Sequence, residues 1–278
     1  MQKKTLFITY CNYEPKLKKI FSKKFNKKLN NTLIWNPQII KKNYKDLNWV
    51  TKDYTKKFNH KSQEIKSTSK IDRSSVMFKG WLKNGCQSWK PQIIYLSLKK
   101  FCKPNDILVY HDINYIKYPL YLKNFNINKS FYSKITKNHS IVLFRDAYQP
   151  LGFQCKNILL KKFNLKKYKA MNGFWSGLIV IKNDSAGRSF IKKWCEISTI
   201  DNLGPLPDTK KKNKDFVINA VDQSTLSILY YKEKKIREKI KIVYAPFRQI
   251  FKFNFFYLRN IKAFLIIKYL ELISIWQQ

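Results

Sequence analysis

Short apolar runs alternate with longer amphipathic stretches along the chain, which predicts strands separated by helices. The runs that predict strands cover residues 5–10, 32–35, 107–110, 140–144, 178–181 and 240–244. Residues 107–110 are apolar without alternation, as expected of a parallel strand that is covered on both faces. The pattern therefore predicts an α/β fold.

The clearest unit is a helix that begins near Pro91 and leads into the strand at residues 107–110. Proline suits the first turn of a helix, where its missing N–H would have no partner. The apolar face of this helix comprises Ile93, Ile94, Leu98 and Phe101. Lys103-Pro104-Asn105 then ends the helix. Directly after the strand come His111, Asp112 and Asn114. Open α/β sheets bind ligands at the carboxyl ends of parallel strands, so this is the candidate site.

Composition favours a single large domain with a strongly basic surface. The chain has 278 residues, and 56 Lys+Arg against 17 Asp+Glu give a formal net charge of +39. Only six of the 56 are arginine, the residue best suited to bidentate phosphate and base recognition, so we expect no nucleic-acid partner. The abundant lysine, asparagine and isoleucine look like the codon bias of an AT-rich genome. The charge would still attract nucleotide-sugars or acidic lipid headgroups.

Cysteine usage and hydropathy bear on the compartment. The five cysteines contain no C-x-x-C pair, which argues against a disulfide framework and against a zinc site. No apolar stretch reaches the ~18 residues of a transmembrane helix. The apolar run at residues 6–11 is too short for the core of a signal peptide. These features predict a cytoplasmic protein.

The chain divides into a domain at residues 1–250 and a basic amphipathic segment at residues 251–278. The segment alternates apolar residues with lysine and arginine. Two interpretations stay open. The segment lies as a helix on an anionic membrane, which makes the protein peripheral on the inner face of the membrane, or it packs onto the sheet.

Four motifs occur in order along the chain. They are Gly85-x-x-x-Trp89-Lys90-Pro91 with the strand that ends at Asp112, Phe144-Arg145-Asp146-Ala147-Tyr148, Phe174-Trp175-Ser176-Gly177, and Val221-Asp222-Gln223-Ser224. Together they resemble a family of small bacterial and viral glycosyltransferases of the GT-A fold. The resemblance covers residues 5–245 and implies a GT-A-like, Rossmann-like mixed and mostly parallel sheet flanked by helices. It implies transfer of a sugar from a nucleotide-sugar donor to a glycan or lipid-linked acceptor in surface polysaccharide synthesis.

On the donor side, the resemblance implies that Thr9 and Tyr10, at the end of the first strand, receive the nucleotide base. It places Lys90 near the diphosphate, at a helix N-terminus that favours anions. It also places Trp89 against a ring and His111 near the donor. The alternatives are a buried first strand, a helix start at which Trp89 anchors the core, and a strand-end side chain rather than a ligand at His111.

The resemblance also implies a divalent metal, Mn²⁺ or Mg²⁺. The family holds the metal or contacts the sugar through an Asp-x-Asp motif or a reduced version of it, which makes Asp112 a catalytic and metal-binding candidate. Here the second carboxylate is replaced by Asn114, whose carbonyl oxygen contributes no charge. Hard cations favour charged oxygen ligands, so we expect weak dependence on metal.

On the acceptor side, the resemblance implies a set of five residues: Arg145, Asp146, Trp175, Gly177 and Gln223. It makes Asp222 a second catalytic candidate, acting as a general base if the enzyme inverts or as an orienting group if it retains. The alternative for Asp222 is a plain N-cap, which contributes ~1 kcal/mol. Two other functions stay open: a non-catalytic basic protein that binds nucleic acid or membranes, and a degenerate, inactive glycosyltransferase.

Overall fold

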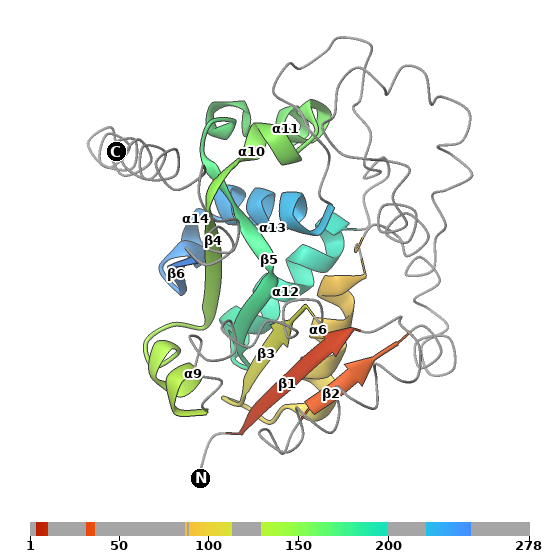
Figure 1. Cartoon of the computed structure of the whole chain (residues 1–278), viewed down its shortest axis with the longest axis vertical. Helices are drawn as coiled ribbons and strands as arrows, with labels where there is room; N and C mark the ends of the chain where they lie inside the picture. Colours follow the sequence, from red (N-terminus) through yellow and green to blue (C-terminus); the bar gives the residue numbers. More distant parts are fainter. Residues whose placement is uncertain are drawn as a thin grey trace, which may run out of the picture.

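The computed structural model describes residues 4–10, 32–36, 87, 89–112, 129–198 and 221–245 (Figure 1). The strands in these ranges are β1 (Thr5–Tyr10), β2 (Thr32–Trp35), β3 (Ile107–His111), β4 (Ile141–Pro150), β5 (Asn172–Lys182) and β6 (Ile240–Ala245). The α-helices are α6 (Lys90–Phe101), α9 (Lys129–Ile135), α10 (Leu151–Gln154), α11 (Asn157–Lys162), α12 (Ser185–Ser198), α13 (Val221–Lys232) and α14 (Lys234–Arg237). A 3-10 helix, η3, covers Lys166–Tyr168.

The strands form one mixed sheet in the order β2-β1-β3-β5-β4-β6. β1 pairs in parallel with β2 and β3, and β4 pairs in parallel with β6. β5 runs antiparallel to both of its neighbours, β3 and β4. The fold is therefore α/β with a mostly parallel sheet, as the sequence predicts. The carboxyl ends of β1, β2 and β3 point to the same edge of the sheet (Figure 1).

The main core lies between the sheet and the helices α6, α12 and α13. Successive strand residues alternate between the two faces, so Leu108 and Tyr110 of β3 belong to this core. On the other face, Phe7 of β1 packs edge-on against Tyr132 of α9, with ring centroids 5.7 Å apart. All five residues of β3 are buried, so both of its faces are covered, which explains the unbroken apolar run in its sequence.

Several predicted boundaries are confirmed, and others are wrong. β1 and β2 coincide with the predicted strands, and α6 begins with Pro91 in its first turn. β4 does not end with its apolar run at Phe144 but continues to Pro150, and β5 begins at Asn172, six residues before the predicted strand at residues 178–181. Both extensions are paired across the sheet with register shifts, so backbone hydrogen bonds prolong the strands beyond their apolar runs.

Ser185, a residue type that favours the N-cap position, is instead the first residue of α12, and Asp184 holds the N-cap position. Asp184 accepts a hydrogen bond from the Gly187 N–H, at 2.8 Å from Oδ1. The buried face of α12 includes Phe190, Ile191, Trp194 and Ile197, which are spaced as on one side of a helix. Asn114 and the segment at residues 251–278 lie outside the described residues. No helix in the described part of the chain is long and apolar enough to cross a membrane.

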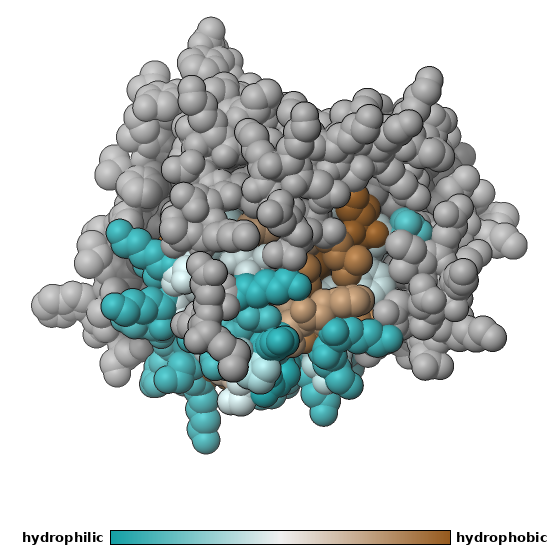
Figure 2. Space-filling view, turned by 90° about the horizontal axis from the view of Figure 1, so that it is seen from below, coloured by the Kyte–Doolittle hydropathy of each residue, from teal (hydrophilic) through white to brown (hydrophobic). Residues whose placement is uncertain are grey.

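The lower end of the molecule lies opposite the carboxyl ends of β1 and β3. Figure 2 views this end, and the described residues on it are largely hydrophilic around a smaller apolar area. Exposed lysines lie just before several strands here, among them Lys4 before β1, Lys103 before β3 and Lys137 before β4. They carry no part of the candidate site and serve below as a reference surface.

Candidate functional site

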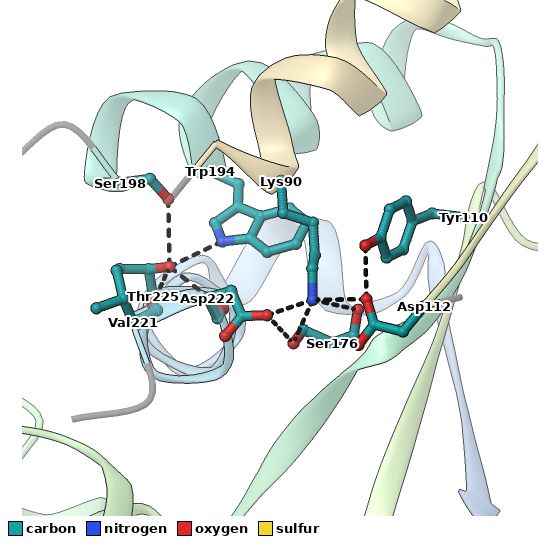
Figure 3. Close-up of polar contacts among 9 residues, drawn as sticks. All are labelled: Lys90, Tyr110, Asp112, Ser176, Trp194, Ser198, Val221, Asp222 and Thr225. Carbon is teal, nitrogen blue, oxygen red and sulfur yellow. Dashed lines mark hydrogen bonds and ion pairs between the residues drawn. The ribbon is translucent and has the colours of Figure 1, made fainter. Parts of the chain in front are cut away.

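Four polar side chains from distant parts of the sequence meet at the carboxyl end of β3 (Figure 3). Lys90 is the first residue of α6, Asp112 follows β3, Ser176 lies within β5, and Asp222 is the second residue of α13. Because β3 and β5 are antiparallel neighbours, the Asp112 N–H donates to the Gly177 carbonyl at 2.8 Å, which brings Ser176 beside the end of β3.

The Lys90 ammonium group is at the centre of this cluster. It is fully buried and ion-pairs with Asp222 and, at 3.3 Å, with Asp112 Oδ1. It also donates to Ser176, with 3.2 Å to the hydroxyl and 3.3 Å to the backbone carbonyl. Burial on its own would lower the pKa of Lys90, but the carboxylates of Asp112 and Asp222 outweigh it and raise the pKa above its usual value. Lys90 is therefore a buried cation.

Asp222 is buried, and its carboxylate accepts several hydrogen bonds. Its side chain is 2% exposed. Oδ2 accepts a hydrogen bond from the Ser176 hydroxyl at 2.5 Å as well as from Lys90. The orientation of the Gln87 amide that satisfies hydrogen bonding places its nitrogen 2.8 Å from the same oxygen. These donors fix the carboxylate in one position.

A hydroxyl network anchors the turn of α13 that carries Asp222 (Figure 3). The Thr225 hydroxyl donates to the Val221 carbonyl at 2.7 Å and accepts from Trp194 Nε1 of α12 at 2.9 Å. Ser198 Oγ lies 3.2 Å from the same hydroxyl. This buried network joins α12 to the start of α13 and so holds Asp222 at the sheet edge.

Asp112 is the part of the cluster that solvent reaches. Its side chain is 20% exposed. Oδ1 accepts from the Tyr110 hydroxyl at 2.5 Å and faces Lys90. Burial, and next the Asp112 charge, raise the pKa of Tyr110 well above its usual value, so Tyr110 remains a neutral donor. Within the described ranges, Oδ2 of Asp112 has no hydrogen-bond partner, so one oxygen is held and the other can accept a ligand.

The predicted donor-side residues of β1 and of the turn before α6 make contacts within the protein that hold the end of β3 in place. The Thr9 hydroxyl donates to the His111 carbonyl at 2.6 Å. Tyr10 and Trp89 are both buried, and their rings pack with centroids 3.8 Å apart. Trp89 therefore lies against a ring that belongs to the protein itself. These contacts fix the end of β3 relative to β1 and the start of α6.

The predicted acceptor-side residues are only partly brought together. Arg145 is buried within β4, where its guanidinium lies 4.9 Å from the Phe174 ring centroid. The Trp175 indole lies over Gly177, where an added Cβ would come within 2.4 Å of the ring, so this position requires glycine. Gln223 is half-buried beside Asp222 on α13. The Asp146 backbone lies in β4, and its side chain is outside the described part.

His111 is a buried neutral side chain behind the site. Its Nδ1 lies 2.9 Å from the Asp112 carbonyl oxygen, and since a carbonyl only accepts, Nδ1 carries the hydrogen. Burial lowers the pKa of His111 to about 4 against the small opposing effect of Asp112. A depressed histidine pKa means that the unfolded chain binds more protons between pH 4 and 6.5, so stability falls as the pH decreases through this window.

We expect the substitution His111→Asn to remove this pH dependence, because asparagine can donate to the same carbonyl but does not titrate. As the pH falls from 6.5 to 4, protonation of His111 in the unfolded chain should lower the free energy of unfolding of the wild-type protein by about 3 kcal/mol. Urea denaturation at several pH values, compared between the two proteins, measures the difference. The carboxylates titrate in both proteins, so parallel pH profiles would contradict the prediction.

Few of the described residues could act as ligands of a metal ion. Among them there is no cluster of three histidine, cysteine, aspartate or glutamate side chains that could hold an ion. Asp112 offers one open oxygen, while Lys90 already neutralises charge at its other oxygen. The described residues do not by themselves form a Mn²⁺ or Mg²⁺ site, so no catalytic step is assigned to a metal.

Three residues that hydrogen-bond to the site carboxylates were not identified from the sequence: Tyr110, Ser176 and Gln87. Tyr110 could have been found, because residues two apart on a strand share a face and Tyr110 precedes Asp112 by two. Ser176 depends on the antiparallel pairing of β3 with β5, which no local pattern predicts. Gln87 adopts a φ of 64°, a left-handed conformation that is uncommon outside glycine and worth noting beside a candidate site.

Comparisons with known proteins assign no family and no function to this site. No protein-family model, no curated protein and no solved structure matches the chain. The candidate site therefore stands on its own geometry: a partly exposed Asp112 supported by a buried, ion-paired Lys90.

Proposed function

We propose that the chain is a glycosyltransferase with a GT-A-like fold, which moves a sugar from a nucleotide-sugar donor to a glycan or lipid-linked acceptor in surface polysaccharide synthesis. The observation that carries this proposal is Asp112 at the carboxyl end of β3, with one carboxylate oxygen held by Tyr110 and Lys90 and the other open. Open α/β sheets bind their ligands at this position.

The convergence of the motifs supports the proposal. Lys90 belongs to the Trp-Lys-Pro motif, Ser176 to the Phe-Trp-Ser-Gly motif, and Asp222 to the Asp-Gln-Ser motif. All three motifs supply a side chain to one hydrogen-bonded cluster, although Lys90 and Asp222 are 132 positions apart. A resemblance that arose by chance would not require these segments to meet.

The geometry suggests a role for each residue. In the transfer, the bond between the anomeric carbon and the diphosphate breaks, the acceptor oxygen bonds to that carbon, and the hydroxyl proton passes to the departing diphosphate or to water. Asp112 contacts the donor sugar through its open oxygen. Lys90 does not reach the diphosphate in this arrangement, because it is buried between two carboxylates, and it acts as a positioning residue. Asp222 takes the orienting role, since its carboxylate already accepts several hydrogen bonds.

The proposal is tested by incubating the protein with a panel of nucleotide-sugars and measuring release of nucleoside diphosphate, with Mn²⁺, with Mg²⁺ and with EDTA. We expect slow hydrolysis of at least one donor, because many transferases pass the sugar to water when no acceptor is present. Binding of a donor without any release, even with acceptor glycans added, would support the degenerate transferase. Neither binding nor release by folded protein would contradict the proposal.

A further inference from the structure

A second surface, away from Asp112, gathers lysines around aromatic rings. It forms where the end of α11, the helix η3, the end of α13 and α14 meet. We call it the basic–aromatic patch; its members are Lys162, Phe163, Lys166, Lys167, Tyr168, Lys232, Lys234 and Arg237. α13 links it to the site, since Asp222 and Lys232 are ten residues apart on this helix. That separation corresponds to about 15 Å along the axis.

Contacts across the patch show that its members share one surface. The Lys232 ammonium lies 5.3 Å from the centroid of the Phe163 ring. Tyr168 stacks on Tyr231 of α13, with centroids 4.8 Å apart. The Lys167 ammonium lies 5.2 Å from the centroid of the Tyr168 ring. The patch therefore joins the α11–η3 segment to the end of α13.

The patch has a strong excess of positive charge. Residues 156–169 contain six lysines and no acidic residue. Glu233, which lies between α13 and α14, is ion-paired with Lys193 at 2.5 Å. Although burial would raise the pKa of Tyr168, Arg237, Lys167 and Lys234 lower it below its usual value, which reports the local positive potential.

The chemistry of the patch fits a lipid surface better than a nucleic acid. The one arginine, Arg237, directs its guanidinium to the backbone carbonyls of Tyr230 and Tyr231, so the exposed charges are lysines. Lysines on long apolar stems around half-buried rings are typical of proteins that lie on anionic headgroups. Ile158, 47% exposed, precedes Lys162 by four residues on the same face of α11 and adds apolar surface.

We propose that the basic–aromatic patch docks the protein on a membrane that contains anionic lipid. Each lysine near such a surface contributes attraction to the negative headgroups, and the rings of Phe163 and Tyr168 lie at the depth of the headgroup boundary. Docking here would keep the start of α13, with Asp222, within about 15 Å of the membrane along one helix. The proposal does not depend on transfer activity, because vesicle binding is measured without substrate.

The test compares the full-length protein with two variants that lower the net charge equally. In the patch variant, Lys162, Lys166, Lys167 and Lys234 are replaced by glutamate. In the reference variant, Lys4, Lys103, Lys134 and Lys137 are replaced by glutamate; these lie at the lower end and on α9. All eight side chains are exposed. Flotation with vesicles of phosphatidylcholine and phosphatidylglycerol should show more than about 100-fold weaker binding for the patch variant.

Three outcomes decide the proposal. The reference variant should bind such vesicles within about threefold of wild type, since attraction is confined to charges near the surface. Equal loss in both variants would mean non-specific attraction by net charge and would overturn the proposal. Retained vesicle binding with lost RNA binding in the patch variant would make the patch a nucleic-acid surface instead. A second patch variant has glutamine at the same four positions, which removes the positive charges without adding negative ones. It controls for misfolding of the glutamate variant and should also lose vesicle binding.

Discussion

Replacing Lys90 with methionine is expected to lower the free energy of unfolding by about 3–5 kcal/mol, the cost of breaking a buried ion pair from one side. Methionine matches most of the length of lysine but removes the charge that separates Asp112 from Asp222. The Asp222 carboxylate, 2% exposed, would remain buried without its cation. Urea denaturation at pH 7 measures the loss, which is a large part of the ~5–15 kcal/mol that stabilises a typical domain.

A double substitution separates the ion pair from simple packing. Adding Asp222→Asn to Lys90→Met removes the unpaired buried charge but keeps an oxygen that can accept from the Ser176 hydroxyl. We expect the double variant to be more stable than Lys90→Met alone, which gives a coupling energy of more than about 1 kcal/mol. If the two substitutions were additive instead, Lys90 and Asp222 would not act as a pair.

Replacing Asp112 with asparagine is expected to reduce kcat/KM for nucleotide-sugar turnover by about 10²–10³-fold, as for loss of one group that stabilises developing charge. The fold should be retained, because asparagine Oδ1 can still accept from the Tyr110 hydroxyl and Lys90 keeps its ion pair with Asp222. Thermal unfolding and turnover are measured on the same preparation.

The matched control is Asp106→Asn at the opposite end of β3. Asp106 is also a carboxylate with structural hydrogen bonds, to the backbone N–H groups of Lys4 and Lys103. The substitution Asp106→Asn should lower the free energy of unfolding and leave turnover unchanged. Asp112→Asn with full activity, or with a loss of stability that accounts for its lost activity, would contradict the assigned role of Asp112.

Local sequence patterns predicted the strands where apolar runs and hydrogen-bonded ladders coincide. β1 and β2 are such strands, and their bounds are as predicted. β4 and β5 run further than their apolar runs because backbone hydrogen bonds across the sheet do not depend on side-chain polarity. The polar residues after Phe144 and the glycines of β5 therefore do not mark the ends of these strands.

The candidate site could be predicted only in part. Asp112 was identifiable because a carboxylate follows a buried strand, and Lys90 because it begins a helix. Their contact with each other, and with Ser176, results from long-range pairing of β3 with β5 and from the packing of α6 on the sheet. Periodicity carries no information about such pairings, so the sequence suggested Lys90 as a ligand-binding residue, whereas its ammonium is buried between carboxylates.

The most direct test of donor binding at Asp112 is isothermal titration of a panel of nucleotide-sugars into wild-type protein and Asp112→Asn, with and without Mn²⁺. We expect saturable one-to-one binding of at least one nucleotide-sugar to the wild type. We also expect at least about tenfold weaker binding to the folded variant, since a hydrogen bond to a charged group contributes about 1.5–3 kcal/mol. Equal affinity in the two proteins, or no binding of any nucleotide-sugar to folded wild-type protein, would contradict the account.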